Sequence, residues 1–557
     1  MKDFKKSVVY QIYPKSFMDS NGDGWGDLKG VTSRLDYLKL LGVDFIWLTP
    51  FYISPQRDNG YDVADYLRID PRFGTMEDFE ELVENAKQRG IEIMLDMVFN
   101  HTSTEHPWFK KALDKDEKYK NYYIFKSSKE NKPPTNWESK FGGSSWEYVE
   151  KYDEYYLHLF DKTQADLNWG NEELREEIYE VINFWISKGV KGFRLDVINL
   201  ISKPELFEDD DKGDGRRFYT DGPKIHDYLK EMNKKSFGNH EGIVTVGEMS
   251  STSIENCIRY SNPNEDELSM VFNFHHLKVD YENGNKWSVM DFDFMKLKEI
   301  LNTWQIGMEK GNGWNAVFWC NHDQPRIVSR FGDDKNYHSE SAKMLATSIH
   351  FFRGTPYIYQ GEEIGMTNPY FDDISLYKDV ESINYYNILL KQGVEKEEIL
   401  NILKAKSRDN SRTPMQWENK ENGGFTSGEP WIDLSSNYDT INVKDALENK
   451  DSIFYHYQKL IKLRKELDII AYGSYIPILE GHDKIYAYIR EYKEEKILVI
   501  NNFFPKETVF ELPSEFDLNG YKIKVLLSNY DSSGEDIRRI TLRPFESVAY
   551  HLEKTHC

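Results

Sequence analysis

The chain has 557 residues, of which 39% are hydrophobic and 30% charged, so it is long enough for several domains with sizeable cores. The formal net charge of -23 disfavours nucleic acid and anionic membranes as partners, because both carry the same sign. We expect no membrane association, since no apolar run reaches the length of about 18 residues that a span requires. The N-terminus lacks the apolar core of a secretory signal, and the three cysteines, Cys257, Cys320 and Cys557, have no metal or disulfide spacing, which favours the cytoplasm.

Short apolar runs that end in polar, Gly or Pro residues recur along the chain, with helix-like stretches between them. In order, these runs cover residues 8–13, 43–49, 91–99, 192–197, 243–247, 268–274, 316–319 and 356–359. The amphipathic stretches include residues 31–42, 76–90, 171–189, 222–233 and 341–352. Alternating strands and helices predict a parallel α/β sheet, and about eight strands favour a closed (β/α)8 TIM barrel over a doubly wound open sheet.

Two segments depart from this alternation. Residues 102–171 are polar and aromatic and contain Gly and Pro, and they are too long for a simple loop, so we expect an inserted subdomain after strand three. From residue 472 onwards short strands alternate with turns, which indicates an antiparallel β-sandwich domain. The sequence therefore predicts a barrel at 1–101 and 172–471, a subdomain at 102–171 and a C-terminal β domain at 472–557.

Ionisable side chains follow four of the predicted strands. Chemistry in such barrels collects at the carboxyl ends of the strands. In chain order these ends carry Asp96 and His101, then Arg194 and Asp196, then Glu248, and finally His322 and Asp323. Each of them could cap a helix or sit on the surface. Four clusters at converging strand ends are nevertheless costly to bring together unless their charges serve a function.

Glycoside hydrolysis needs a set of this kind. One carboxylate acts as nucleophile and one protonated carboxyl as acid, about 5–5.5 Å apart when configuration is retained. Arg194, two residues before Asp196, points to the same barrel face and would hold Asp196 ionised. Glu248 has no adjacent cation in the sequence and is the better candidate for a raised pKa and the acid role. Asp323 would bind sugar hydroxyls and favour the oxocarbenium-like transition state.

Several motifs in fixed order resemble glycoside hydrolase family 13, the α-amylase superfamily. They are DMVFNH (96–101), GFRLDV (192–197), VGEM (246–249) and NHDQPR (321–326), and VVYQIYPKSF, GYDVADY, GTPYIYQGEE and RDNSRTPMQW resemble its oligo-1,6-glucosidase branch. The resemblance implies a retaining hydrolase with Asp196 as nucleophile, Glu248 as acid/base and Asp323 as transition-state stabiliser. It also implies that one glucose is bound by Asp62, His101, Arg194, His322 and Arg408. Asp62 and Arg408 would close the pocket and make the enzyme exo-acting.

Other stretches are similar to the phospho-α-(1,1)-glucosidases of this branch, among them residues 213–229 and 273–287. This similarity implies a small phosphorylated disaccharide, α,α-trehalose 6-phosphate, as substrate. A phosphate group needs cations on the aglycone side of the pocket, and the candidates are Lys278, Lys286, Arg216 and Arg217. An oligo-1,6-glucosidase or a glucosyl-transferring relative remains the alternative, and Val197 after the nucleophile is typical of α-1,6-type or non-malto substrates. A catalytically silent sugar-binding protein is disfavoured because all three carboxylates are present.

The loop DSNGDGWGDLKG (19–30) spaces oxygen ligands in the manner of a calcium loop. Its candidate ligands are the side chains of Asp19, Asn21, Asp23 and Asp27 and the carbonyl of Trp25. Position 12 is Gly30, so the bidentate Glu of an EF-hand is missing. Oxygen ligands suit a hard cation, and family members bind Ca²⁺ here, so we expect a structural Ca²⁺ and no organic cofactor. The alternative is a loop of Asx turns without metal.

Overall fold

A computed structural model describes residues 2–127, 132–531 and 536–555 of the chain; Cys557 lies outside these ranges. Its centre is an eight-stranded sheet in which each strand runs parallel to its neighbours, in the order β13-β12-β11-β5-β2-β1-β15-β14. The strands are β1 (Val9–Ile12), β2 (Phe45–Leu48), β5 (Glu92–Met97), β11 (Gly192–Leu195), β12 (Val244–Glu248), β13 (Met270–Phe272), β14 (Ala316–Val317) and β15 (Thr355–Tyr359). A parallel bridge between Val271 and Asn315 joins the two ends of the sheet. The predicted barrel is therefore confirmed, and the open-sheet alternative is wrong.

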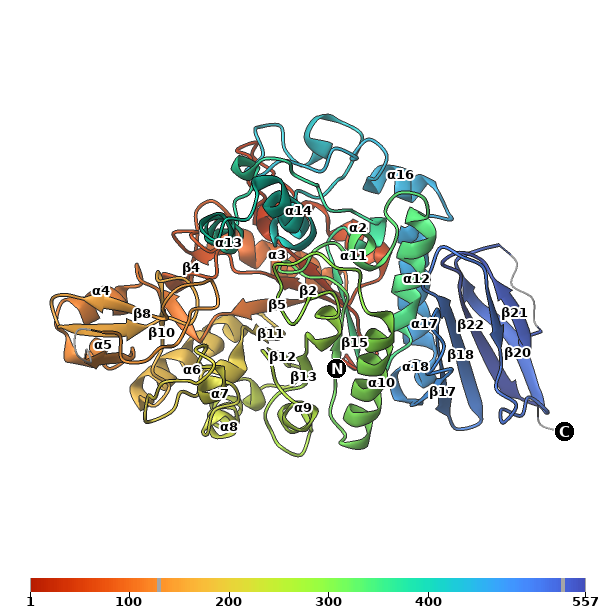
Figure 1. Cartoon of the computed structure of the whole chain (residues 1–557), viewed down its shortest axis with the longest axis horizontal. Coiled ribbons are helices and arrows are strands. Elements are labelled where there is room, and N and C mark those ends of the chain that lie inside the picture. Colours follow the sequence, from red (N-terminus) through yellow and green to blue (C-terminus); the bar gives the residue numbers. More distant parts are fainter. Residues whose placement is uncertain (1, 128–131, 532–535, 556–557) are drawn as a thin grey trace.

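Helices follow the strands and cover the outside of the barrel (Figure 1). These helices are α1 (Leu28–Ser33), α2 (Leu35–Leu41), α3 (Met76–Gln88), α6 (Glu172–Ser187), α8 (Ile225–Lys235), α9 (Ile254–Ser261), α10 (Phe294–Lys310), α12 (His338–His350) and α17 (Ile453–Glu466). In α6, Asn171 caps the first turn by accepting a hydrogen bond from the Leu174 amide, and Leu174, Ile178, Ile182 and Trp185 form one buried face. Within the described ranges, every helix is too short or too polar to cross a membrane.

The segment between β5 and β11 forms a small lobe of its own, drawn in orange at one end of the molecule in Figure 1. It contains β6 (His101–Ser103), α4 (Pro107–Leu113), α5 (Glu117–Lys120), β7 (Phe125–Ser127), β8 (Trp146–Val149), β9 (Glu154–Leu157) and β10 (Gln164–Asp166). Strands β6 and β10 pair antiparallel where the chain leaves and re-enters the barrel, and β7, β9 and β8 form a second sheet. His101 therefore lies at the junction of the lobe and the barrel.

A partly helical excursion after β15 lies over the carboxyl ends of the strands. It includes α13 (Val380–Lys391), α14 (Lys396–Lys406) and α15 (Asp409–Arg412). Shorter elements elsewhere are β3 (Tyr52–Ile53), β4 (Asp65–Ile69), α7 (Arg216–Tyr219), α11 (Ile327–Phe331), α16 (Val443–Glu448) and α18 (Asp468–Tyr472). Single 3₁₀ turns are η1 (Pro14–Ser16), η2 (Ile198–Leu200), η3 (Phe237–Asn239), η4 (His275–Leu277), η5 (Glu362–Ile364), η6 (Ile374–Leu376) and η7 (Glu421–Gly424). The excursion brings Arg408 and Arg412 to the carboxyl ends of the barrel strands, where both contact Asp323.

The C-terminal region consists of antiparallel strands, drawn in blue at the other end of the molecule in Figure 1. One sheet has the order β16 (Ser474–Ile478), β17 (Ile485–Tyr492), β18 (Glu495–Asn502), β22 (Ser547–Lys554) and β20 (Tyr521–Ser528), and β19 (Thr508–Glu511) pairs with β21 (Arg539–Leu542). Ile485, Ile500, Phe510 and Leu542 belong to one buried cluster between these sheets. On the barrel side, Lys298 of α10 donates to the carbonyls of Leu479, His482 and Ile485, which fixes the β domain to the barrel.

Candidate active site

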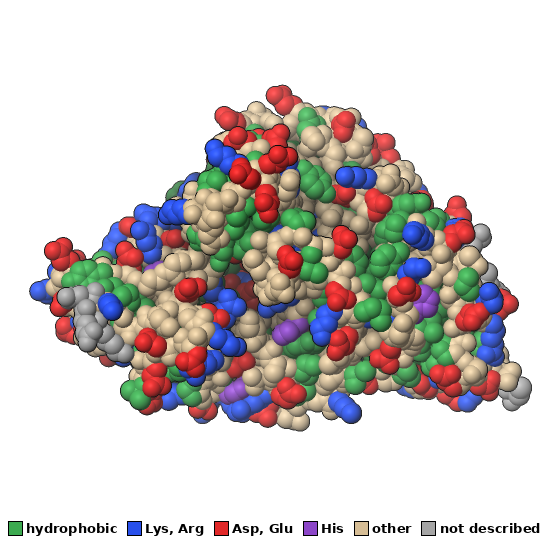
Figure 2. Space-filling model, viewed as in Figure 1, with side chains coloured by type: hydrophobic (Ala, Val, Ile, Leu, Met, Phe, Trp, Pro, Cys, Tyr) green, Lys and Arg blue, Asp and Glu red, His purple; other side chains and the backbone are tan. Residues whose placement is uncertain are grey.

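A cavity of about 240 Å³ opens at the carboxyl ends of the barrel strands. Asp196 follows β11, Glu248 ends β12 and Asp323 follows β14, and all three line this cavity. His101, Lys278, Lys286 and Arg408 line it as well. Figure 2 shows that this face of the molecule is hollowed near its centre, with Lys and Arg side chains around the opening. The structure thus brings most of the residues singled out from the sequence into one site.

Arg194 lies at the centre of this site. Its guanidinium is 2.8 Å from Asp96 Oδ1 and 2.6 Å from Asp196 Oδ1, and it also contacts the carboxyl of Glu248. The register explains this convergence, because Arg194 is paired with Asp96 across β11 and β5, and Asp196 follows the last residue of β11. The sequence showed only the link to Asp196. No cation adjoins Glu248 in the sequence, but in the structure Arg194 reaches its carboxyl from the neighbouring strand.

The carboxyl groups of Asp196, Glu248 and Asp323 nevertheless have different pKa values. Burial raises the pKa of Asp196 to about 6, although Arg194 opposes the rise. Burial, together with the charges of Asp196 and Asp323, raises the pKa of Glu248 to about 8. Burial alone would raise the pKa of Asp323 too, but the guanidinium charges of Arg408 and Arg412 hold it well below its usual range. Near neutral pH, Asp196 and Asp323 are therefore ionised and Glu248 is protonated, which is the division of roles that acid-assisted chemistry requires.

Two buried histidines stand beside these carboxylates. His322 Nε2 is 3.2 Å from Asp323 Oδ2, and Gln11 Nε2 donates to His322 Nδ1 over 2.8 Å. This fixes the orientation of the ring, which stacks on Tyr61 with 5.0 Å between ring centroids. His101 Nε2 lies 3.0 Å from the Tyr61 carbonyl. Burial lowers the pKa values of both histidines, so they remain neutral hydrogen-bonding groups.

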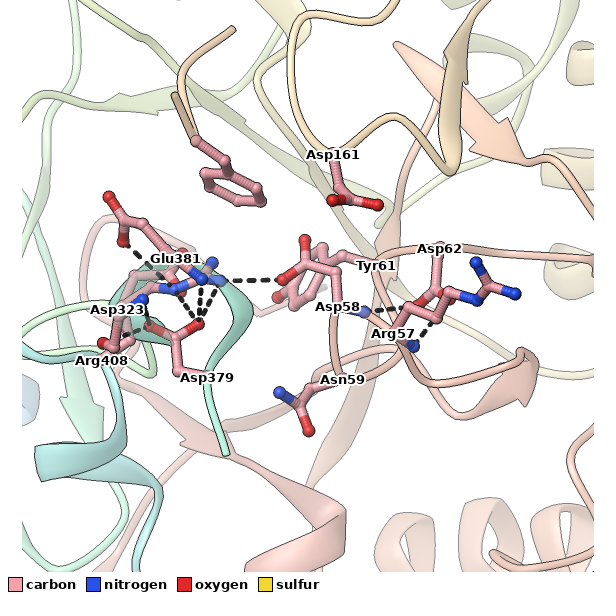
Figure 3. A network of polar contacts seen from close by, with 12 residues as sticks. Arg57, Asp58, Asn59, Tyr61, Asp62, Asp161, Asp323, Asp379, Glu381 and Arg408 are labelled. Carbon is pink, nitrogen blue, oxygen red and sulfur yellow. Dashed lines mark hydrogen bonds and ion pairs between the residues drawn. The ribbon is translucent and has the colours of Figure 1, made fainter. Parts of the chain in front are cut away.

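The structure corrects one predicted residue, Asp62. Its carboxylate accepts hydrogen bonds from Ser54 Oγ and from the backbone amides of Arg57 and Asp58, and it is fully buried away from the cavity. Asp58, which the sequence analysis did not single out, lines the cavity and pairs with Arg408 at 2.9 Å. Figure 3 shows Asp58 directed to Arg408 and Asp62 directed to the backbone of its own loop. Asp58 and Asp62 stand in the same motif, and only their side-chain directions distinguish them.

Arg408 connects the excursion to the barrel. Besides Asp58, its guanidinium contacts Asp379 at 2.5 Å, Glu381 at 3.4 Å and Asp323 at 3.4 Å (Figure 3). Nearby, Arg412 lies 2.7 Å from Asp323. Asp379 and Glu381 were not predicted. Asp379 caps the start of α13 and Glu381 lies in its first turn, and acidic residues are common at both positions in helices without any further role. This network narrows one side of the cavity with charged groups.

The four cations predicted to bind phosphate are placed differently from one another. Lys278 lines the cavity and has no ion-pair partner among the described residues. Lys286 lines the cavity but is 2.7 Å from Glu381. Arg217 is exposed and lies 2.7 Å from Asp210, while the exposed Arg216 is 3.4 Å from Asp214. One further lysine, Lys140, lines the cavity and was missed, because it follows no predicted strand.

The loop at residues 19–27 is built from Asx turns. Asp19 accepts hydrogen bonds from the amides of Asn21, Gly22 and Gly24, and Asp27 caps α1 through the Gly30 amide. Among the residues that the structure describes, the Asp23 carboxylate accepts a hydrogen bond only from the Trp25 amide. Over residues 2–127, 132–531 and 536–555, no group of three or more His, Cys, Asp or Glu side chains converges as a metal cluster. A carboxylate has about four lone-pair positions, so Asp23 and the amide oxygen of Asn21 keep free positions for a hard cation.

The sequence matches two known family profiles. Residues 11–473 match the alpha amylase catalytic domain, and residues 485–549 match the alpha-amylase SusG C-terminal domain. The chain belongs to the α-amylase family, glycoside hydrolase family 13. The family predicted from the motifs is therefore confirmed, and the second match covers the antiparallel strands at the C-terminus.

Several relatives align with this chain over nearly their whole length. A trehalose-6-phosphate hydrolase of Bacillus subtilis is 58% identical over 99% of this chain and 98% of its own. An oligo-1,6-glucosidase of Bacillus cereus is 51% identical, covering 99% of both chains. The crystal structure of Bacillus licheniformis trehalose-6-phosphate hydrolase has a TM-score of 0.95 and 61% identity, covering 99% of this chain and 100% of that one. The relatives therefore include both substrate classes considered from the sequence.

The different contacts of Asp58 and Asp62 predict different consequences of substitution. Asp58→Asn removes the partner of Arg408 in the cavity, so we expect kcat/KM to fall about 10²-fold through misplacement of that side chain. Asp62→Asn puts an amide where a buried carboxylate accepts three hydrogen bonds, so we expect about 2 kcal/mol less stability. Steady-state kinetics and thermal unfolding of both variants test this. Equal loss of activity with unchanged stability in Asp62→Asn would restore Asp62 to the site.

Proposed function

We propose that this α-amylase-family chain is a retaining α-glucosidase that hydrolyses α,α-trehalose 6-phosphate to glucose and glucose 6-phosphate. One observation carries this proposal. The cavity combines an ionised and a protonated carboxyl group, Asp196 and Glu248, with a lysine, Lys278, that has no ion-pair partner among the described residues. Carboxyl groups of this kind hydrolyse a glycosidic bond, and a free cation suits an anionic leaving group. The identity to the Bacillus subtilis trehalose-6-phosphate hydrolase supports the same substrate.

The pKa order assigns the chemical steps. Ionised Asp196 attacks the anomeric carbon while protonated Glu248 gives its proton to the glycosidic oxygen, which releases glucose 6-phosphate and leaves a glucosyl ester on Asp196. Glu248, now a carboxylate, takes a proton from water, and the resulting hydroxide displaces Asp196 to give glucose with retained configuration. Asp323 stays ionised and stabilises the positive charge that develops on the sugar ring.

The remaining polar groups would hold the glucose that is transferred. His322 and Arg408 are fixed by their own contacts and would present donors to sugar hydroxyls, while Arg194 holds Asp196 in place. His101 gives its ring N–H to the Tyr61 carbonyl and would contact the sugar through the face of its ring. The Asp58–Arg408 pair would close the pocket beyond this glucose, which makes the enzyme exo-acting. On the opposite side, Lys278 is the first candidate for the phosphate. Lys286 and Arg217 are weaker candidates because carboxylates already neutralise them.

The second candidate is an oligo-1,6-glucosidase that acts on isomaltose-type sugars, or a glucosyl-transferring relative. It is favoured by the Bacillus cereus oligo-1,6-glucosidase at 51% identity and by Val197, which lines the cavity directly after Asp196. A neutral leaving group gives no reason for an unpaired lysine at the cavity wall, because burial lowers the pKa of Lys278 and destabilises its charge. We therefore place this candidate second.

We also propose a structural Ca²⁺ in the loop at residues 19–27. Its ligands would be Asp19, Asn21, Asp23 and Asp27 with the Trp25 carbonyl, all of them oxygen donors of the kind that Ca²⁺ prefers. The positions left free at Asn21 and Asp23 support this. The loop precedes α1 in the sequence and is hydrogen-bonded to residues 425–431. An ion bound here would stabilise the contact between these two segments and would take no part in the reaction.

Two further parts of the proposal concern the chain as a whole. We infer that residues 1–101 and 172–471 act as the catalytic domain, 102–171 as a subdomain that walls the cavity, and 472–557 as a stabilising β domain; the Lys298 contacts support the last role. We also infer a cytoplasmic enzyme. Cys257 and Cys320 are buried free thiols, which suits a reducing compartment.

Substrate preference tests the proposed function. Glucose release is measured from α,α-trehalose 6-phosphate, trehalose and isomaltose at equal concentration. We expect kcat/KM for the phosphorylated sugar to be higher by about 10²-fold, because charge-assisted hydrogen bonds to the phosphate contribute roughly 3 kcal/mol. Lys278→Ala should raise the KM for the phosphorylated sugar and reduce this preference. A wild-type preference for isomaltose would instead support the oligo-1,6-glucosidase function, and Lys278 would then have no role in substrate recognition.

The pKa values predict a bell-shaped pH profile. Asp196 must be ionised, so kcat/KM should fall below pH 6, and Glu248 must be protonated, so kcat/KM should fall above pH 8, with the optimum between these values. A neutral aryl α-glucoside is the right substrate, because no phosphate titrates. In Glu248→Ala the basic limb should disappear, since an aryl leaving group departs without an acid. A basic limb that persists in this variant would remove Glu248 from the acid role.

Calcium removal tests the loop. We expect EDTA to lower the thermal unfolding midpoint and added Ca²⁺ to restore it, because an ion bound only by the folded chain stabilises it by mass action. Asp23→Ala should abolish the dependence on Ca²⁺, whereas Asp439→Ala, at an exposed position outside the loop, should keep it. The same midpoint with and without EDTA would show that the loop is held by its Asx turns alone.

A further inference from the structure

Lys140 occupies an unusual position in the cavity wall. It comes from the segment 102–171 and reaches the same cavity as Glu248 and Asp196. Its ammonium group has one hydrogen-bond partner among the described residues, Ser250 Oγ at 3.2 Å, and no ion-pair partner there. An ammonium group has three donors, so at least two remain free to bind a ligand.

The surroundings of Lys140 make its positive charge costly. Burial, together with the charges of Arg216 and Lys278, lowers its pKa to about 7. Lys278 is affected in the same way by Arg216. Lys140 from the lobe and Lys278 after η4 line the same cavity, and Arg216 at the start of α7 is close enough for its charge to act on both. Two buried lysines that share a cavity wall without an ion-pair partner among the described residues favour an anionic ligand there.

Neighbouring cations do not share this property. Lys286, which lines the same cavity, is neutralised by Glu381 at 2.7 Å. Arg217 points to Asp210 at 2.7 Å although it adjoins Arg216 in the chain. Asp214, the acidic partner of Arg216, lies at 3.4 Å, and the Arg216 side chain is 52% exposed, so this ion pair contributes little. Lys140 and Lys278 are thus lysines of the cavity wall that have no ion-pair partner among the described residues, and Arg216 adds a positive charge near them.

We propose that Lys140 is a specificity-determining residue that, together with Lys278 and Arg216, binds the phosphate of the departing sugar. This inference rests on the proposed function. Ser250, which contacts Lys140, stands two residues after Glu248, so the cation group lies on the side of the cavity where the acid delivers its proton. The phosphorylated sugar is therefore the leaving group, and the glucose bound to Asp196 is unsubstituted.

A consequence concerns small anions. The group Lys140, Lys278 and Arg216 would bind inorganic phosphate without the sugar, because a phosphate dianion offers oxygens to several cations at once. Inorganic phosphate should then compete with the phosphorylated disaccharide. Its binding should also raise the thermal unfolding midpoint of the folded chain.

Lys140→Met is the decisive variant, because methionine keeps the apolar stem and removes the charge. Lys126→Met is the matched control, since Lys126 is in the same lobe, faces the Phe207 ring and does not line the active-site cavity. We expect Lys140→Met to lower the ratio of kcat/KM for α,α-trehalose 6-phosphate over trehalose by 10- to 100-fold. Most of this change should lie in the KM for the phosphorylated sugar. Lys140→Arg should recover part of it, and Lys126→Met should keep the wild-type ratio.

Thermal shift with inorganic phosphate gives a second readout that needs no turnover. The midpoint of the wild type and of Lys126→Met should rise with phosphate, and that of Lys140→Met should not. An unchanged substrate ratio and an unchanged phosphate shift in Lys140→Met would overturn the inference while the wild-type preference for the phosphorylated sugar stands. Loss of that preference in the wild type itself would instead overturn the proposed function.

Discussion

The Arg194 guanidinium is the interaction on which the site depends. It sits inside the barrel with 1% of its side chain exposed and is shared by Asp96, Asp196 and Glu248. Three carboxyl groups at this depth would all be protonated without a cation, because burial disfavours the charged form. With Arg194 as the one cation among these three groups, Asp196 has the lower pKa and is ionised, and Glu248 has the higher pKa and stays protonated. The division between nucleophile and acid therefore follows from having fewer cations than carboxyl groups at the barrel centre.

A second layer of charge surrounds the first and determines the shape of the pocket. Arg408 and Arg412 come from the excursion after β15, and their contacts with Asp323 and Asp379 bring together segments that are far apart in the sequence. Breaking such a pair leaves a buried charge without compensation, which costs more than the pair contributes. The excursion is therefore held in one arrangement over the strand ends. This rigidity keeps Asp323 ionised and positions the closing pair of Asp58 and Arg408.

Strands and carboxylates could be predicted because their signals are local. Apolar runs bounded by polar residues gave all eight barrel strands, and Asp196, Glu248 and Asp323 stand next to those runs. The sequence could not show which of Asp58 and Asp62 faces the cavity. The two residues lie four positions apart in one tight turn, and only the conformation of that turn directs Asp58 to Arg408 and Asp62 to the backbone. The neutralisation of Lys286 by Glu381 and the position of Lys140 depend on contacts across about 95 and 110 residues respectively, which no local pattern contains.

The lobe that carries Lys140 is separate from the strand ends that carry Asp196 and Glu248. Relatives named as trehalose-6-phosphate hydrolases and as oligo-1,6-glucosidases align with this chain over nearly their full length, so the fold alone does not select the substrate. The groups that act on the transferred glucose belong to strand ends and to the charge network that holds them. The cations on the leaving-group side belong to the lobe at residues 102–171 and to the loops after β11 and β13. These segments can change their charge without disturbing Arg194 and its carboxylates, so recognition of the leaving group is separable from the chemistry of bond cleavage.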